Sequence, residues 1–270
     1  MPTKLVNKHL NKSAELLGRG IDNSRFPGVT HLQLVENLFM CLSGNEIYNL
    51  NHPAITAHDR NLRYDELGSL FTIVDLVHED VRGADPLVEW YRNDQGLTEA
   101  PLNEVPKMVV QQRLDNLVER RNDIAHRGGN PDDRLGADEM RQLVDFVLAL
   151  ARSVFIVFVA GYLQKHHVGD ANCAQLERTE GPFDGQTVWV VKPPLTRMYV
   201  SQPIFAMSNG FLARWGRVES LKIDDVDHAF VEPGGTEDIG IKFDFAAPKT
   251  ARLYVLGQED ELIWPSSTKS

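Results

Sequence analysis

The sequence predicts an α + β protein in separate domains, with an N-terminal all-α helical bundle followed by a small antiparallel β-barrel. From about residue 3 to residue 166 the apolar residues recur with a helical period. After Gly169 the chain changes to short runs rich in β-branched and aromatic residues, which Pro, Gly and Asp separate. We therefore expect a helical domain over 1–166, a linker over 167–184 and a β-barrel domain over 185–265.

The helical domain is expected to contain a shorter first helix and four long ones. Prolines interrupt the pattern at Pro53 and Pro101, and the Gly-Gly-Asn-Pro sequence at 128–131 is a strong stop signal. The long helices are predicted at 31–50, 63–81, 104–126 and 137–167.

The β-rich region is expected to form antiparallel strands joined by short turns. Its apolar runs have the length and residue types of strands, and turn residues separate them. The clearest runs lie at 187–191, 197–201, 217–223, 239–245 and 252–256.

Composition narrows the classes of function. The 270 residues carry a net charge of −10, which disfavours strong non-specific binding to nucleic acid but leaves room for a local basic site, and arginines do gather over 113–141. The cysteines, Cys41 and Cys173, lie far apart and form no CxxC pair, so neither a disulfide framework nor a cysteine-based zinc site is expected. We expect a reducing, cytoplasmic setting.

Neither a membrane segment nor a bound metal is expected. The N-terminus is polar and does not have the pattern of a secretory signal, and the uncharged run over 153–163 is shorter than the roughly 20 residues that a membrane span needs. His166, His167 and Cys173 could suggest a metal, but adjacent histidines on a helix cannot easily face one ion. No metal and no cofactor is therefore predicted.

The most informative stretch is LDNLVERRNDIAHRGG, near the end of the third long helix. Asn122 and His126 are four residues apart and share a helical face. Arg121 lies about 140° round a regular helix from His126. Arg121 and His126 can therefore meet at one phosphate only if the helix loosens near Gly128 or a second subunit contributes.

These residue types suit the transesterification of RNA. Imidazole titrates near neutrality, so His126 can move the proton of a 2′-hydroxyl, and the guanidinium of Arg121 matches the charge that develops on the phosphorane. Asn122 can orient the histidine or the phosphate. Because one histidine cannot be base and acid in the same concerted step, a symmetric dimer is expected.

The stretch closely resembles the motif of the HEPN superfamily, above all the RiboL-PSP and MAE_28990-like branches. The resemblance implies a dimeric helical bundle that cleaves RNA without metal, in phage defence or a toxin–antitoxin system. It assigns the catalytic positions to Arg121, Asn122 and His126, and we add Arg120 and Arg127 as candidate RNA contacts. A glycine often follows the histidine where this chain has Arg127. Gly128 replaces the tyrosine of one toxin branch, which argues against regulation by adenylylation of that tyrosine.

The β-rich region resembles the second domain, a β-barrel, of translational GTPases such as elongation factor Tu. The likeness lies in the residues over 216–224 and 239–244, and the chain has no phosphate-binding loop of the form GxxxxGK[ST]. The resemblance implies that the barrel docks RNA, such as a tRNA end or a ribosomal element, or binds a protein. A barrel used only for folding or subunit contact fits the same pattern.

Three alternatives stay open. Arg121 can instead pair with Glu119 or Asp123 while His126 complements the negative end of the helix. The domain can be a non-catalytic binding module, or a sensor or antitoxin subunit whose partner supplies the activity. The expected partners are RNA (tRNA or ribosomal RNA), a second copy of the chain, and an antitoxin or regulatory protein.

Overall fold

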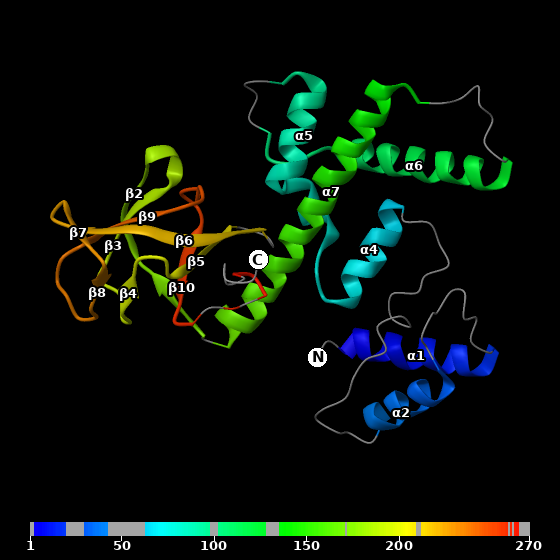
Figure 1. Ribbon diagram of the computed structural model, residues 1–270, viewed down its shortest axis with the longest axis horizontal. Coiled ribbons are helices and arrows are strands. Elements are labelled where there is room, and N and C mark those ends of the chain that lie inside the picture. Colours follow the sequence, from blue (N-terminus) through cyan, green and yellow to red (C-terminus); the bar gives the residue numbers. More distant parts are fainter. Residues whose placement is uncertain are drawn as a thin grey trace. The chain divides into compact units, whose positions relative to one another are not determined.

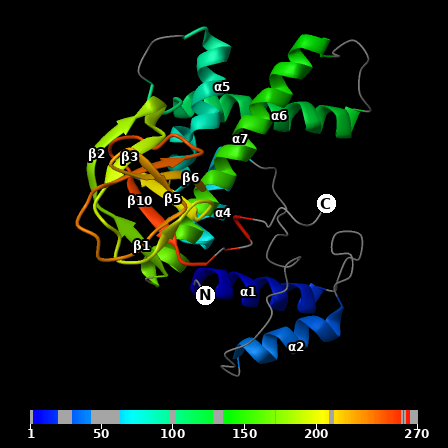
Figure 2. The same ribbon diagram turned by 60° about the vertical axis from the view of Figure 1, so that its left-hand side comes forward.

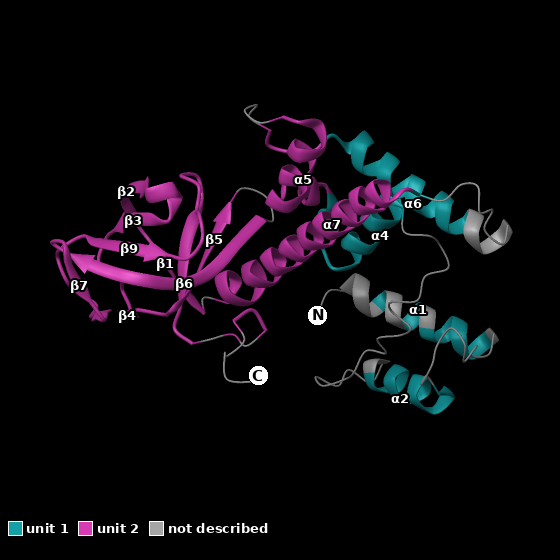
Figure 3. Ribbon diagram, turned by 45° about the horizontal axis from the view of Figure 1, so that its top comes forward, with its two compact units in different colours: residues 1–78, 106–135 teal, residues 79–105, 136–270 magenta. Residues whose placement is uncertain are grey.

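The computed structural model describes residues 3–19, 30–42, 63–97, 102–127, 135–170, 172–208, 212–258, 260 and 262–264. The chain forms two compact units, which Figure 3 colours separately. Unit 1 comprises Met1–His78 and Pro106–Leu135, and unit 2 comprises Glu79–Val105 and Gly136–Ser270. The last long helix therefore belongs to the same unit as the β-rich region, unlike the expected division near residue 166.

Helices make up the described part of the chain up to Gly169, as expected (Figure 1). In unit 1 they are α1 (Thr3–Arg19), α2 (His31–Leu42), α4 (Tyr64–Ile73) and α6 (Lys107–Arg127). A 3-10 helix, η1 (His78–Gly83), precedes α5 (Asp85–Gln95). The longest helix, α7 (Ala137–Leu163), continues into a π-helical segment, η3 (Gln164–Gly169).

Two helical predictions need correction. The helix expected over 63–81 ends at Ile73, because Asp75 takes a positive φ of 60° and the Leu76 amide turns back to the Phe71 carbonyl. Helix α5 was not expected at all. The helix predicted over 31–50 is present as α2, and its last part, 43–50, lies outside the described residues.

The strands form a curled antiparallel sheet. They are β1 (Cys173–Leu176), β2 (Arg178–Phe183), β3 (Val188–Val191), β4 (Met198–Tyr199), β5 (Pro203–Ser208), β6 (Leu212–Ile223), β7 (Val226–His228), β8 (Phe230–Val231), β9 (Ile239–Phe243) and β10 (Arg252–Leu256). The pairing order of the main sheet is β1-β10-β5-β6-β9-β3-β2, with β7 paired to β6. A separate two-stranded sheet joins β4 to β8.

The sheet curls because its two edges are neighbours in the chain. Strands β1 and β2 stand at opposite ends of the pairing order, yet Glu177 alone separates them. The Glu177 carbonyl accepts a hydrogen bond from the Lys192 amide at 2.8 Å. This half-barrel, visible in Figure 2, confirms the barrel-like architecture but begins earlier than expected, because β1 and β2 occupy the region predicted to be a linker.

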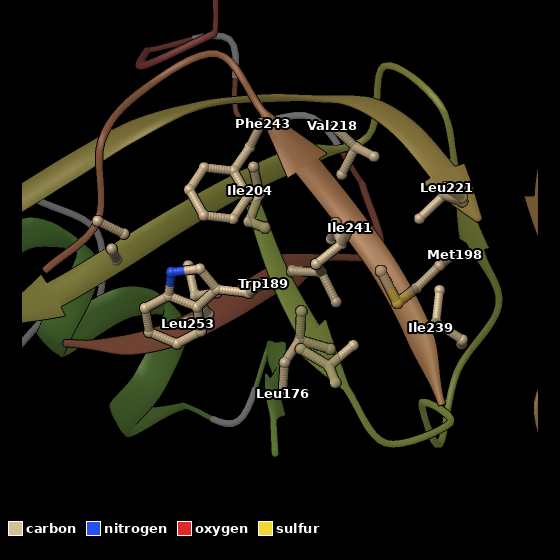
Figure 4. Packing of buried hydrophobic residues seen from close by; sticks show 14 of the residues in the cluster. Leu176, Trp189, Met198, Ile204, Val218, Leu221, Ile239, Ile241, Phe243 and Leu253 are labelled. Atoms are coloured by element: carbon tan, nitrogen blue, oxygen red, sulfur yellow. The ribbon is translucent and has the colours of Figure 1, made fainter. Parts of the chain in front are cut away.

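The inner face of the curled sheet encloses one hydrophobic core (Figure 4). Trp189 and Phe243 meet there edge to face, with ring centroids 6.3 Å apart. Ile204, Leu221 and Ile241 are fully buried around them. Burial of these apolar side chains is the main force that holds the half-barrel together.

The outer face of the sheet is covered at β5, β6 and β10 by the end of α7. Alternate side chains of a strand point to opposite faces, so Phe205 and Tyr254 leave the inner core and stack on each other at 5.1 Å. They join Val159 and Leu163 of α7 and Trp264 in a second core. Residues 203–207 of β5 are buried on both faces and are all apolar. Because α7 packs on the sheet, the boundary between the units does not fall at residue 166.

Helix α7 also explains the longest apolar run of the sequence. The helix and η3 together span Ala137–Gly169, and among the described residues this segment alone has the length and composition that could cross a membrane. The uncharged run over 153–163 is therefore only one part of a much longer helix. Ser153, Val157 and Ala160 within the run are fully buried in the protein core.

Candidate functional site

The predicted site lies on α6, which the sequence placed almost correctly. Pro106 lies immediately before the helix, and its carbonyl accepts the first hydrogen bond, from the Val109 amide at 3.0 Å. Proline suits a helix start because the missing amide has no partner there anyway. The helix ends at Arg127, immediately before the glycine pair predicted to stop it.

One face of α6 anchors it in unit 1. Val110, Leu114 and Val118 are buried along this face, and α6 packs on α4. At the start of α4, the Arg63 guanidinium donates to the Asp115 carboxylate at 2.7 Å. These contacts fix the rotation of the helix and hence the direction in which its later side chains leave it.

The site residues follow directly after this anchored segment. Arg120 and Arg121 are exposed and Asn122 is half-buried. Arg121 lies about 20° round the helix from the buried Leu114, so it continues the anchored face one turn beyond Val118. Arg121 is nevertheless exposed at this point of the helix, and it and Asn122 also take part in interactions within the chain.

The helix does not loosen before His126. It remains α-helical through Arg127, which keeps the backbone positions of Arg121 and His126 about 140° apart. Asn122 and His126 are about 40° and 6 Å apart along the same side. The side chains over 123–127, including those of His126 and Arg127, lie outside the described residues. The expectation that a second subunit brings Arg121 and His126 to one phosphate therefore stays a prediction.

The charge of α6 differs in sign from that of the whole protein. Over Lys107–Arg127 the helix has five basic and three acidic residues, whereas the chain as a whole has a net charge of −10. Local positive charge is what contact with phosphate requires. Helix α6 is therefore a local basic site in an otherwise acidic protein.

The histidines at the end of α7 have a different role. His167 Nε2 donates to the Asp260 carboxylate at 2.9 Å, and the Tyr162 hydroxyl donates to the same oxygen at 2.7 Å. The hydrogen bond to Asp260, together with burial, raises the pKa of Tyr162 to about 12. Burial acts to raise the pKa of Asp260, but the hydrogen bonds from Tyr162, His167 and the Leu262 amide outweigh it and lower that pKa.

This cluster holds the fold together and does not present a reactive group. His167 Nδ1 is shielded from solvent, so the ring has no nitrogen open to a substrate. Sequence reasoning missed the cluster because Asp260 lies 93 residues from His167. Within the described residues, no group of three or more His, Cys, Asp or Glu side chains could hold a metal ion.

A comparison with known families identifies the family to which the helical part belongs. The model of the RiboL-PSP-HEPN family matches residues 1–160, more than half of the chain. The chain belongs to the RiboL-PSP-HEPN family. The HEPN match includes all of α6 and ends within α7, three residues before that helix does. Membership of this family suggests a nuclease or RNA-related role for the domain.

Other comparisons are less informative. No curated protein matches the chain. Among solved structures, GDP-bound aIF5B from Aeropyrum pernix is similar at 12% identity and a TM-score of 0.23, over 43% of this chain and 19% of its own length. The chain thus spans less than a fifth of that structure. A likeness at this TM-score carries no conclusion about the function of the chain.

Proposed function

We propose that this HEPN protein is a metal-independent endoribonuclease, built from Arg121, Asn122 and His126 in a dimer. The observation that carries the proposal is the family match over residues 1–160, which includes the Arg-Asn-Asp-Ile-Ala-His sequence on α6. The surface position of Arg121 and the shared side of Asn122 and His126 support it.

The reaction needs two proton transfers at one phosphate. His126 of one copy takes the proton of the 2′-hydroxyl, whose oxygen attacks the adjacent phosphorus. The bond from phosphorus to the 5′-oxygen breaks, and the protonated His126 of the second copy gives its proton to that oxygen. The products are a 2′,3′-cyclic phosphate and a 5′-hydroxyl.

Arg121 and Asn122 supply the remaining roles. The guanidinium of Arg121 donates to the equatorial oxygens of the phosphorane, where negative charge accumulates in the transition state. Asn122, one helical turn before His126, orients the imidazole or the scissile phosphate. Arg120 and Arg127 hold neighbouring phosphates of the RNA. Phage defence or a toxin–antitoxin system is the setting we propose, with cellular or invading RNA as the substrate.

The test is expression of wild type, His126→Ala and Arg121→Ala in bacteria, with growth recorded and new RNA ends sequenced by a method specific for 2′,3′-cyclic phosphates. Arg141→Ala and His31→Ala are matched controls, since both residues are exposed on other helices. Wild type and the controls should arrest growth and produce cyclic-phosphate ends, whereas the two site variants should do neither.

The same experiment addresses the rival classes. If wild type and both site variants bind the same RNA or protein and none cuts, the protein is a binding or sensor module. If a co-purifying partner must be removed before wild type cuts, that partner is its antitoxin or regulator.

A further inference from the structure

Helix α7 exposes a line of large apolar side chains on one face. Their spacing of three, four, seven or one residue keeps them within about 100° of arc. Each has an exposed fraction between 40% and 58%. We call this set the α7 stripe, and it consists of Met140, Val144, Val147, Leu148, Phe155 and Phe158. The stripe is about 27 Å long, which is five turns of helix.

The stripe lies opposite the face that packs on α5. Phe146, Leu150 and Val157 are buried on that face, and the Phe146 ring contacts Trp90 of α5 at 4.9 Å. The centres of the two faces are about 130° apart round the helix. A helix that is apolar on two opposite faces is expected to bury both, and an exposed apolar patch of this length is typical of an interface.

Two charges beside the stripe indicate what covers it. Asp145 and Arg152 are exposed, lie two turns apart and are on the same flank of the stripe. Within the described part of the chain, neither has an ion pair or hydrogen bond. Opposite charges that cannot reach each other within one helix can do so between two copies.

Only one direction of pairing matches these charges. When two identical helices pack antiparallel, the same flank of each meets the other, so Asp145 of one copy faces Arg152 of the second, and the reverse. In a parallel pair this flank meets the opposite one, where Leu143 and Val154 lie, and the charges have no partner.

The charges and the stripe also share a centre. Asp145 and Arg152 are equidistant from the point between Leu148 and Ala149, and the two ends of the stripe, Met140 and Phe158, are equidistant from Ala149. A two-fold axis beside Leu148 therefore aligns the apolar stripes over their full length and pairs the charges at the same time.

We propose that the α7 stripe is the surface on which a second copy of this chain docks, with the two α7 helices antiparallel about a two-fold axis near Leu148. This inference deepens the proposed function, because it names the contact for the second copy that the chemistry requires. The test of this inference measures the association of two chains and not RNA cleavage. A failure of the inference can therefore be distinguished from a failure of the ribonuclease proposal.

The first test is disulfide trapping in a variant without native cysteines, Cys41→Ser with Cys173→Ser. Leu148→Cys lies at the proposed axis, where the two cysteines come within disulfide reach. Met140→Cys is the control, because an antiparallel pair separates its two copies by about 25 Å. Mild oxidation should give a covalent dimer of Leu148→Cys and at most traces with Met140→Cys.

The second test exchanges the charges. Asp145→Arg and Arg152→Asp each place like charges opposite each other twice per dimer, and sedimentation velocity should show the dissociation constant rising about tenfold or more. The double variant restores the pairs with reversed signs and should return to within about threefold of wild type. Circular dichroism checks that every variant keeps its helices.

Four results would overturn the proposal. Covalent dimers with both cysteine variants would mean a parallel pair, and none with either would place the contact elsewhere or leave the stripe covered within one chain. A wild type that stays monomeric up to high micromolar concentration would also overturn the proposal. A folded double variant whose dissociation constant is no lower than those of the single variants would also overturn it.

Discussion

The Tyr162 hydroxyl donates a hydrogen bond to the Asp260 carboxylate at 2.7 Å, although 98 residues separate them in the chain. Tyr162 lies in the last turn of α7, and Asp260 lies four residues before the buried Trp264. This bond ties the end of the chain to the helix that covers the sheet. Together with the burial of Trp264, it holds the segment beyond β10 against the half-barrel.

Removing this hydroxyl should destabilise unit 2. In Tyr162→Phe the Asp260 carboxylate loses one of its donors, and a hydrogen bond to a charged group stabilises a protein by about 2 kcal/mol. Urea unfolding should show that the free energy of unfolding falls by this amount. Tyr91→Phe is the control, because the Tyr91 hydroxyl makes no such bond among the described residues. Equal losses in both variants would contradict this role.

The contribution of this pair should also depend on pH. Because the pKa of Asp260 is lowered from 3.8 in the fold, its stabilisation is complete above about pH 4 and is lost as pH falls through the folded value. Because the pKa of Tyr162 is raised from 10.0 to about 12, its stabilisation is complete below pH 10 and is lost as pH rises towards 12. The difference in unfolding free energy between wild type and Tyr162→Phe should thus be largest between these limits and shrink on both sides. A difference that does not vary with pH would count against the hydrogen bond.

Gly216 should not tolerate a side chain. A Cβ there would lie 1.7 Å from Asp244 Oδ1 and 2.9 Å from the Phe245 ring. Asp244 cannot simply move, because this oxygen accepts from the Arg217 amide at 2.8 Å. Gly216→Ala should cost about 2–3 kcal/mol in thermal or urea unfolding. Gly257→Ala is the control, since nothing lies within 4 Å of its Cβ, and comparable losses in both would refute the steric explanation.

Ser153 should stabilise the start of α5. Its hydroxyl, fully buried on α7, accepts a hydrogen bond from the Leu87 amide at 3.1 Å, and Ala84 at the N-cap has no side chain to do so. Ser153→Ala should cost about 1 kcal/mol, and hydrogen exchange should speed up at the first turn of α5. Ser69→Ala, an exposed serine on α4, should leave both measurements unchanged.

The guanidinium of Arg121, and not only its charge, should matter if the protein cleaves RNA. Arg121→Lys keeps the charge but loses the fork that contacts two phosphate oxygens. We expect the cleavage rate of bound RNA to fall about tenfold or more while RNA affinity changes little. Arg141→Lys, at an exposed position on α7, is the control and should cut at the wild-type rate.

The sequence predicted those features that depend on local chemistry. The glycines after Arg127 marked the end of α6, although the predicted start at residue 104 came before Pro106, after which the helix begins. Alternating apolar residues marked strands such as β3 and β9. The resemblance at 121–126 led to the correct family. In each case the signal is contained in a few consecutive residues.

The sequence could not predict those features that depend on distant contacts. Asp75 breaks a helix that the apolar pattern would continue, and only the turn back to Phe71 reveals it. The apolar period of α7 did not indicate that its last turns would cover the sheet. An apolar position gives the same sequence pattern whether it packs on a helix or on a strand. For the site, a linear motif names Arg121, Asn122 and His126 but does not show whether a second copy completes the site.

Glu177 has a consequence for how the half-barrel meets other proteins. Exposed strand edges invite pairing with another chain, and a sheet normally offers two of them. Here one residue holds the two edge strands together at one end, so neither edge is open along its whole length. An added strand could pair with these edges only from the opposite end. Lengthening the link at Glu177 by a few glycines would let the edge strands β1 and β2 separate and would create a site for aggregation.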